Sequence, residues 1–162
     1  MLKSKIFLLL YNYLPKGILQ NHLHKLKAST IRIIKDKLRQ KGFLKKNKIP
    51  TVDFVSVDSK ENVKEASKKF GYPMYLKARE DAYDGKGNHL IKSEKDINIG
   101  IKKLKGRSLY VERFVPFTIE LAVMVARSVR GEVKVYPVVE TIHQDSICDT
   151  VIAPAKISKV AR

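Results

Sequence analysis

A pair of short apolar segments on either side of a glycine-containing loop restricts the fold of this chain more than any other sequence feature. Residues 74–78 and 89–91 have strand-like composition, and the loop between them contains Asp84 and Gly85, a strong turn signal. The pattern predicts a β-hairpin, in which the two strands pair antiparallel. A chain arranged around such a hairpin is not expected to form an alternating βαβ fold.

Helical patterns flank the predicted hairpin. The first begins near residue 29, and its buried face would contain Ile31, Ile34 and Leu38 at three- and four-residue spacing. A second helix is predicted over residues 60–70. A third should follow the Ser-x-x-Asp sequence at 93–96, which resembles a capping box.

The pattern changes from helical to β after residue 108. A strand is predicted over 109–114, and a second hairpin is predicted from 121–128 and 132–139 around Arg130 and Gly131. The order is therefore helix, helix, hairpin, helix and then antiparallel strands. This order predicts the α+β class.

The positive charge of the chain is concentrated near its N-terminus. The 162 residues carry a formal net charge of +17, of which residues 1–50 contribute +12, with Asp36 as their single acidic residue. Such a segment could form the phosphate-binding footprint of a basic nucleic-acid-binding module, which we keep as the alternative function. Against this alternative, the chain contains no recognised DNA- or RNA-binding motif.

Residues 1–29 differ from the rest of the chain, and we predict a domain division between them and residues 30–162. The apolar run Ile6–Tyr11 resembles a signal-peptide core, but no small-x-small cleavage site follows it. A membrane-surface helix over 19–27, a helix packed on a domain or partner, and a poorly ordered extension remain open. No apolar stretch is long enough to span a membrane, and a single cysteine, Cys148, excludes an intramolecular disulfide.

The loop at residues 82–88 is a candidate phosphate-binding segment. Its glycines allow backbone N–H groups to approach an anion, and Lys86 adds a positive charge. An ordinary hairpin loop would have the same composition. Lys77, on the preceding strand, either needs a buried partner or lies on a solvent-exposed face of the sheet.

Three further polar residues have two interpretations each. Glu112 could serve a site or pair with Arg113 or a cross-strand cation. Glu120 could accept hydrogen bonds from a pair of ligand hydroxyls or cap the edge of a strand. His143 could be a catalyst or, as a lone histidine more often is, a hydrogen-bonded structural residue. No histidine or cysteine spacing indicates zinc, and no Ser-His-Asp arrangement is present.

Taken in order, these segments resemble a known family. The loop Ala82–Asn88, with sequence Ala-Tyr-Asp-Gly-Lys-Gly-Asn, and the Glu-Thr-Ile-His-Gln-Asp string at 140–145 are its most specific motifs. Together they are similar to the ATP-grasp domain of the phosphoribosylaminoimidazole carboxylase and carboxyaminoimidazole ribonucleotide synthetase family. Residues 140–143 and 147–149 are most similar to the fungal bifunctional type. The matching segments are 31–37, 40–41, 77–79, 82–88, 110–123, 136–145 and 153–155.

The resemblance implies a role for each matched site residue. Two lysines would contact the ATP phosphates, the glycine loop would fold over them as a flap, and the end of the 109–114 strand would line the adenine. Glu120 would accept from ribose hydroxyls, and His143 would lie at the nucleotide site. The implied ATP-binding residues are Lys37, Lys77, Ala82, Tyr83, Asp84, Gly85, Lys86, Gly87, Asn88, Glu112, Arg113, Phe114, Val115, Glu120 and His143.

The resemblance also implies a function in purine biosynthesis. ATP would activate bicarbonate, and the aminoimidazole ribonucleotide would capture the carboxyl group, in a cytoplasmic and commonly homo-oligomeric enzyme that needs magnesium. Neither nucleic acid nor a membrane is then expected as a partner. The metal ligands would lie after Ala155, so we expect a partial ATP-grasp fold: a small α+β subdomain and the first antiparallel strands of a larger one. Since the chain ends at Arg162, we expect a fragment inactive alone, assign it no catalytic or metal-binding residue, and leave its own enzymatic status open.

Overall fold

A computed structural model of the chain describes residues 28–82, 86–128, 130–144 and 147–157. The chain divides into two compact units, and each is described by itself. We refer to their described residues as the 28–115 unit and the 116–157 unit. The predicted division near residue 29 falls at the margin of the described residues and stays a prediction.

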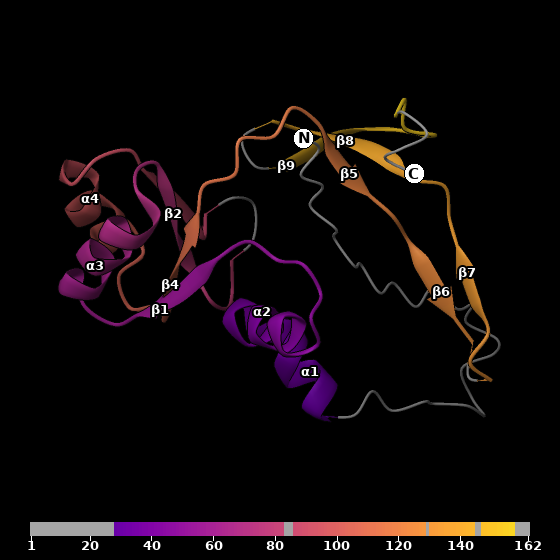
Figure 1. Ribbon diagram of the computed structural model, residues 1–162, viewed down its shortest axis with the longest axis horizontal. Coiled ribbons are helices and arrows are strands. Elements are labelled where there is room, and N and C mark those ends of the chain that lie inside the picture. The colour runs from indigo at the N-terminus through magenta and orange to yellow at the C-terminus, as the bar shows by residue number, and fades with distance from the viewer. Residues whose placement is uncertain (1–27, 83–85, 129, 145–146, 158–162) are drawn as a thin grey trace. The chain divides into compact units, whose positions relative to one another are not determined.

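A four-stranded antiparallel sheet forms the centre of the 28–115 unit (Figure 1). Its strands lie in the order β1-β4-β2-β3, and Leu76 of β2 lies opposite Val111 of β4. The predicted hairpin of β2 and β3 is confirmed. The strands are β1 (Phe54–Val57), β2 (Met74–Ala78), β3 (Asn88–Ile91) and β4 (Leu109–Arg113).

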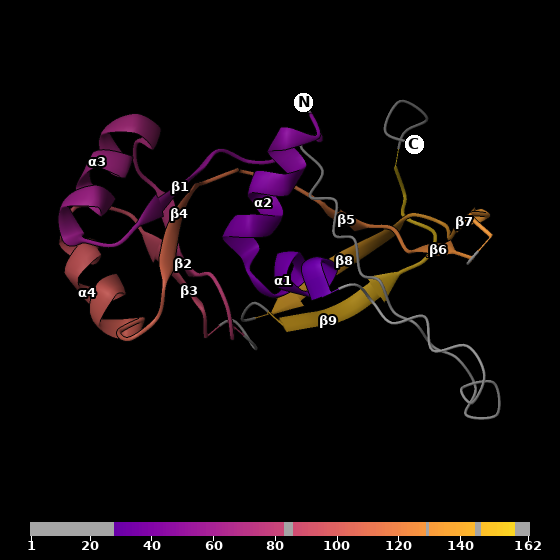
Figure 2. The same ribbon diagram turned by 90° about the horizontal axis from the view of Figure 1, so that it is seen from below.

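Helices α3 (Lys60–Phe70) and α4 (Lys95–Lys103) cover one face of this sheet (Figures 1 and 2). Apolar side chains of the helices and strands form the core there, and Val63, Leu76 and Ile97 are almost completely buried. Because side chains alternate along a strand, Lys77 and Glu112 lie on the opposite face of the sheet. The predicted helix at 60–70 is confirmed, with Ser59 capping its first turn.

The predicted capping box before α4 forms only in part. The carboxylate of Asp96 accepts hydrogen bonds from the backbone N–H groups of Lys92 and Ser93, at 2.9 and 2.8 Å. The Ser93 hydroxyl, however, donates to the same carboxylate at 3.2 Å, so Asp96 supplies the side-chain acceptor at the start of this helix.

Two helices, α1 (Ala28–Lys35) and α2 (Lys37–Lys46), replace the single helix predicted at the start of the unit. Asp36 separates them because its backbone is extended, with φ −104° and ψ 107°, and its carboxylate caps α2. The predicted buried face is also wrong: Ile31 and Ile34 are 43% and 46% exposed. Helix α2 lies on the side of the sheet opposite α3 and α4 (Figure 2).

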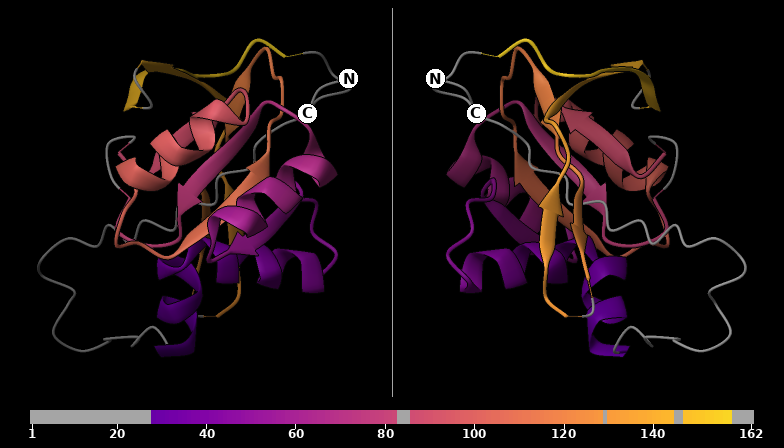
Figure 3. Two further views of the ribbon diagram at one scale, coloured as in Figure 1. Left: turned by 90° about the vertical axis from the view of Figure 1, so that its left-hand side faces the viewer. Right: turned by 90° about the vertical axis from the view of Figure 1, so that its right-hand side faces the viewer.

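Five short strands make up the 116–157 unit (Figure 3). The sequence predicts one strand over 121–128, but the structure has two, β5 and β6. The first pairs with β8, and the second forms the predicted hairpin with β7. A change of pairing partner leaves the alternation of valines intact, so the sequence does not reveal it. The strands are β5 (Glu120–Ala122), β6 (Val125–Arg127), β7 (Val133–Val135), β8 (Val139–Gln144) and β9 (Ile147–Ile152).

The N-terminal residues 1–27 lie outside the part of the chain that the structure describes. The signal-peptide, membrane-surface and packed-helix hypotheses for them therefore stay predictions. Within the described residues, no helix has both the length and the apolar character needed to cross a bilayer.

Two helical glycines should respond in opposite ways to substitution by alanine. A Cβ at Gly100 would lie 2.6 Å from His89 Cδ2 and 3.2 Å from Leu76 Cδ2, whereas a Cβ at Gly42 meets no atom within 4 Å. We expect Gly100→Ala to lower the free energy of unfolding by about 1–3 kcal/mol through overpacking. Gly42→Ala should raise it by up to about 1 kcal/mol through helix propensity.

Urea denaturation of both variants measures the difference. Equal effects of the two substitutions would contradict the described packing of α4 on the sheet.

Candidate functional site

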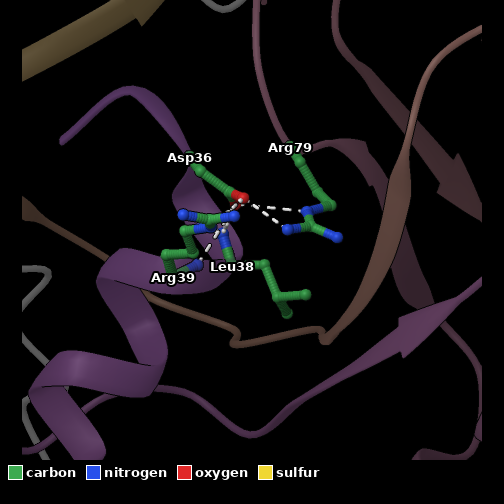
Figure 4. A network of polar contacts seen from close by, with 4 residues as sticks. All are labelled: Asp36, Leu38, Arg39 and Arg79. Carbon is green, nitrogen blue, oxygen red and sulfur yellow. Dashed lines mark hydrogen bonds and ion pairs between the residues drawn. The ribbon is translucent and has the colours of Figure 1, made fainter. Parts of the chain in front are cut away.

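A buried carboxylate ties the start of α2 to the end of β2. Asp36 is 2% exposed, and its side chain accepts hydrogen bonds from the backbone N–H groups of Leu38 and Arg39, at 2.9 and 3.1 Å. Arg79, the residue after β2, donates to both oxygens of the same carboxylate, from Nε at 3.2 Å and from Nη2 (Figure 4). The N–H of Lys37 also donates to the carbonyl oxygen of Arg79, at 2.9 Å. These bonds fix the position of α2 over the sheet.

The partners of Asp36 keep its carboxylate charged. Burial raises the pKa of Asp36, but the hydrogen bonds and charge of Arg79 and the backbone donors outweigh it, so the pKa lies below its ordinary value. The same contact raises the pKa of Arg79. The pair is therefore a fixed anion and a fixed cation at the junction of helix and sheet.

A second buried carboxylate lies on the sheet face below α2. Glu112 of β4 is 5% exposed, and its Oε2 lies 2.7 Å from Lys77 Nζ while its Oε1 lies 3.0 Å from Lys41 Nζ. Of the sequence interpretations, pairing with a cross-strand cation is confirmed. Arg113 instead has its guanidinium Nε 3.7 Å from Asp53. Burial raises the pKa of Glu112, but the charges of Lys77 and Lys41 lower it by a larger amount. The pKa of Glu112 therefore lies below its ordinary value.

Lys37 is the third cation of this face. Burial, followed by repulsion from Lys77, lowers the pKa of Lys37, while attraction to Glu112 raises it. Lys37 has no ion pair with a carboxylate among the described residues, in contrast to Lys41 and Lys77. We call these three lysines and Glu112 the lysine face. With three ammonium groups and one carboxylate it has a net charge of +2, which favours a multiply charged anion as its ligand.

The phenol of Tyr110 completes the polar groups on this side of β4. It is 2% exposed and lies opposite Lys77 in the strand register. Burial, followed by the charge of Glu112, raises the pKa of Tyr110 well above its ordinary value. The phenol therefore stays neutral beside the charged groups.

The glycine loop begins and ends beside the lysine face. The N–H of Ala78 donates to the carbonyl oxygen of Gly87 at 2.9 Å, and Asn88 lies opposite Lys77 in the strand register. A Cβ on Gly87 would lie 2.0 Å from the Cβ of Ala82, so only glycine allows the loop ends to approach this closely. Lys86 is exposed. Tyr83, Asp84 and Gly85 lie outside the described residues, and their predicted contacts stay predictions.

The remaining predicted residues lie in two places. At the end of β4, the ring of Phe114 stacks on that of Tyr75 with centroids 5.9 Å apart, and Val115 follows. In the 116–157 unit, Nδ1 of His143 lies 3.8 Å from Oε2 of Glu120. The structure thus brings Lys37, Lys77 and Glu112 together in one unit and Glu120 and His143 together in the other.

Three residues of the site were not recognised from the sequence as site residues: Asp36, Lys41 and Arg79. Asp36 is the one acidic residue among the first 50, directly before a helical segment, and this isolation is a signal that could have identified it as a cap. Lys41 lies one helical turn after Lys37. The partner of Arg79 is 43 residues away, so no local pattern identifies it.

Comparisons with known proteins identify the family of this chain. A model of the ATP-grasp domain matches residues 42–162. The chain is 46% identical over 129 residues to phosphoribosylaminoimidazole carboxylase from Schizosaccharomyces pombe, a match that covers 80% of this chain and 23% of that protein. It is 35% identical over 131 residues to N5-carboxyaminoimidazole ribonucleotide synthase from Synechococcus elongatus, covering 81% of this chain and 33% of that protein.

A solved structure has a similar fold. The crystal structure of carboxyaminoimidazole ribonucleotide synthase from Aspergillus clavatus complexed with ATP matches with a TM-score of 0.78 and 39% identity, over 82% of this chain and 35% of that chain. The predicted resemblance and the α+β ATP-grasp fold are therefore confirmed. The chain spans about a quarter of the length of its curated fungal relatives. These relatives are biosynthetic enzymes and give no support to the nucleic-acid alternative.

Two substitutions of Asp36 should separate its two roles. Asn can still cap α2 but cannot pair ionically with Arg79, whereas Ala removes both contacts. We expect Asp36→Asn to lower the free energy of unfolding by about 1–3 kcal/mol, through the lost charged hydrogen bonds. Asp36→Ala should cost about 1 kcal/mol more, through the lost cap.

The same carboxylate should give the stability a pH dependence. Because its pKa is lower in the folded chain than the unfolded value of about 3.9, its contribution is complete above that value and is lost as the pH falls through the folded pKa. Urea denaturation between pH 2.5 and 7 tests both statements. A pH profile identical in the wild type and in Asp36→Asn would contradict the described pair.

Proposed function

The chain belongs to the ATP-grasp family, and on this premise we propose that the lysine face binds the phosphates of ATP. The observation that carries the proposal is the convergence of Lys37 and Lys77 around one buried carboxylate, beside the two ends of a glycine loop. The lysines compensate the charge of the polyphosphate, and Glu112 holds the Lys77 ammonium in place.

The other matched residues receive roles that fit their positions. The loop Ala82–Asn88 would fold over the phosphates, and residues 112–115 would line the adenine through backbone groups. Glu120 would accept hydrogen bonds from the ribose hydroxyls, and His143 beside it would lie against the nucleotide. The 3.8 Å separation of His143 and Glu120 supports a shared site for this pair.

We propose that the complete protein is a carboxyaminoimidazole ribonucleotide synthetase or the corresponding part of a phosphoribosylaminoimidazole carboxylase. ATP would activate bicarbonate, and the amine of aminoimidazole ribonucleotide would take up the carboxyl group, which is ligase chemistry. A lyase or decarboxylase step that moves the carboxyl group to carbon would belong to another domain. The cytoplasm is the proposed location of this protein. The Aspergillus clavatus enzyme has been crystallised with ADP and 5-aminoimidazole ribonucleotide, which supports this substrate.

Magnesium is the expected metal of such a reaction, because it neutralises the transferred phosphate. Within the described residues, no three or more carboxylate, histidine or cysteine side chains lie together as a metal site. We therefore assign no metal ligand to this part of the chain and derive no step that uses one.

Substitution of Lys77 tests the proposed phosphate contact. We expect Lys77→Ala to weaken ATP binding about 10- to 100-fold, through loss of a charged hydrogen bond. Lys102→Ala is the matched control, since Lys102 is exposed on α4, on the far side of the sheet, and its removal changes the net charge equally. Isothermal titration calorimetry of the full chain with ATP measures both. Equal affinities of the two variants would refute the assignment.

Substitution of Gly87 tests the glycine loop. A Cβ at this position forces Ala82 to move, so Gly87→Ala should displace the loop and weaken ATP binding about tenfold. Gly42→Ala, where the added Cβ meets open space, serves as the control. Calorimetry reports the affinity, and thermal unfolding reports whether the variant is folded. A folded Gly87→Ala chain with wild-type affinity would remove the loop from the proposed site.

A further inference from the structure

Lys41 belongs to the lysine face but has no role in the proposed ATP contacts. Its ammonium is surrounded by protein groups: Glu112 Oε1 at 3.0 Å, Thr51 Oγ1 at 3.1 Å, and the ring of Phe54 with its centroid at 5.7 Å. The side chain is 14% exposed. An ammonium with this set of neighbours is fixed in place, and the ammonium of Lys77 is held in the same way, by Glu112 Oε2 at 2.7 Å and the Tyr75 ring with its centroid at 5.2 Å.

Lys37 has the opposite environment. It lies one helical turn before Lys41 on α2, and it has no ion pair with a carboxylate among the described residues. Its charge interacts with that of Glu112 without a direct ion pair. Among the described residues, Lys37 is therefore the cation of the lysine face that has no carboxylate partner.

The two oxygens of Glu112 connect these lysines. One oxygen faces Lys77 and the other faces Lys41, so each oxygen of the carboxylate already has one ammonium partner. Glu112 is 5% exposed, and leaving one oxygen of such a buried carboxylate without a cation costs free energy. Without Lys41, Lys37 is the nearby cation of α2 that can relieve this cost.

We infer that Lys41 is a positioning residue for nucleotide binding, which occupies Glu112 Oε1 and thereby leaves Lys37 unpaired for the phosphates. The expected effect of Lys41 on ATP affinity rests on the proposed function. Its structural content, the effect of Lys41 on Lys37, can be tested without nucleotide.

Four variants of the full chain test the expected effect of Lys41 on ATP affinity. Lys41→Met removes the charge at nearly constant size and should weaken ATP binding about tenfold, as contacting residues of one network commonly couple by this amount. Lys41→Arg restores a cation and should stay within about threefold of the wild type. Thr51→Val removes a hydrogen bond from Lys41 without changing the charge, and its ATP affinity should lie between those of Lys41→Met and Lys41→Arg. Lys45→Met, one turn later on α2 and exposed, is the charge-matched control.

Isothermal titration calorimetry with ATP gives the four affinities, and thermal unfolding confirms that each variant is folded. Equal affinities of Lys41→Met and Lys45→Met would overturn the inference. Should Lys41→Met not fold, Thr51→Val decides: wild-type affinity for ATP in this variant would overturn the inference.

A double-mutant cycle with Glu112→Gln separates positioning from direct contact. Since the proposed effect of Lys41 passes through the Glu112 carboxylate, Lys41→Met should have little further effect on ATP affinity in the Glu112→Gln chain. Fully additive effects of the two substitutions would show that Lys41 contacts the nucleotide itself and would overturn the positioning role.

The reactivity of Lys37 provides a test without nucleotide. Trace acylation with acetic anhydride, read by mass spectrometry, reports the fraction of each lysine that is uncharged and accessible. In Lys41→Met, Lys37 should pair with Glu112 and react several-fold more slowly than in the wild type or in Lys45→Met. An unchanged rate would overturn the inference. If the wild type binds no ATP but this rate falls as expected, the proposed function fails while the arrangement of lysines stands.

Discussion

The carboxylate of Asp36 sets the geometry on which the candidate site depends. It interrupts the helical segment at the start of the described chain, caps α2 and holds the guanidinium of Arg79 at the end of β2. Because the start of α2 and the end of β2 are both fixed, one turn of α2 places Lys37 and Lys41 over the sheet face that carries Glu112. A helix without this break would continue in the direction of α1.

Burial explains why a few charges suffice to organise this face. Asp36 and Glu112 are 2% and 5% exposed, and each is matched by cations that keep it ionised in spite of the low dielectric. Such paired charges contribute less to stability than to the positions of their partners, because desolvation offsets much of the attraction. Because the lysine face has more ammonium groups than carboxylates, it favours an anion as its ligand.

The fold was predictable from the sequence where local patterns decide it. The helix at 60–70 and the β2–β3 hairpin follow from periodicity and turn residues, and both are confirmed. The break at Asp36 was missed although its cap bonds are local, because the sequence does not show its ion-pair partner Arg79, 43 residues away. The change of partner between β5 and β6 was missed because the pairing of β5 with β8 is a long-range contact. The same holds for the site. The position of Lys77 on its strand was predictable, but the ion pair of Lys41 with Glu112 joins residues 71 positions apart (112 − 41) and needs the folded sheet.

The central claim is that adenine nucleotide binds at the lysine face. The most direct measurement is a titration of the 15N-labelled full chain with ATP, followed by amide chemical shifts in NMR spectra. The account predicts saturable shifts in the first turn of α2, at the end of β2 and in residues 112–115, with little change along α4 on the opposite face of the sheet. Saturable shifts confined to α4 or other exposed lysines, or no saturable shifts at all, would contradict it.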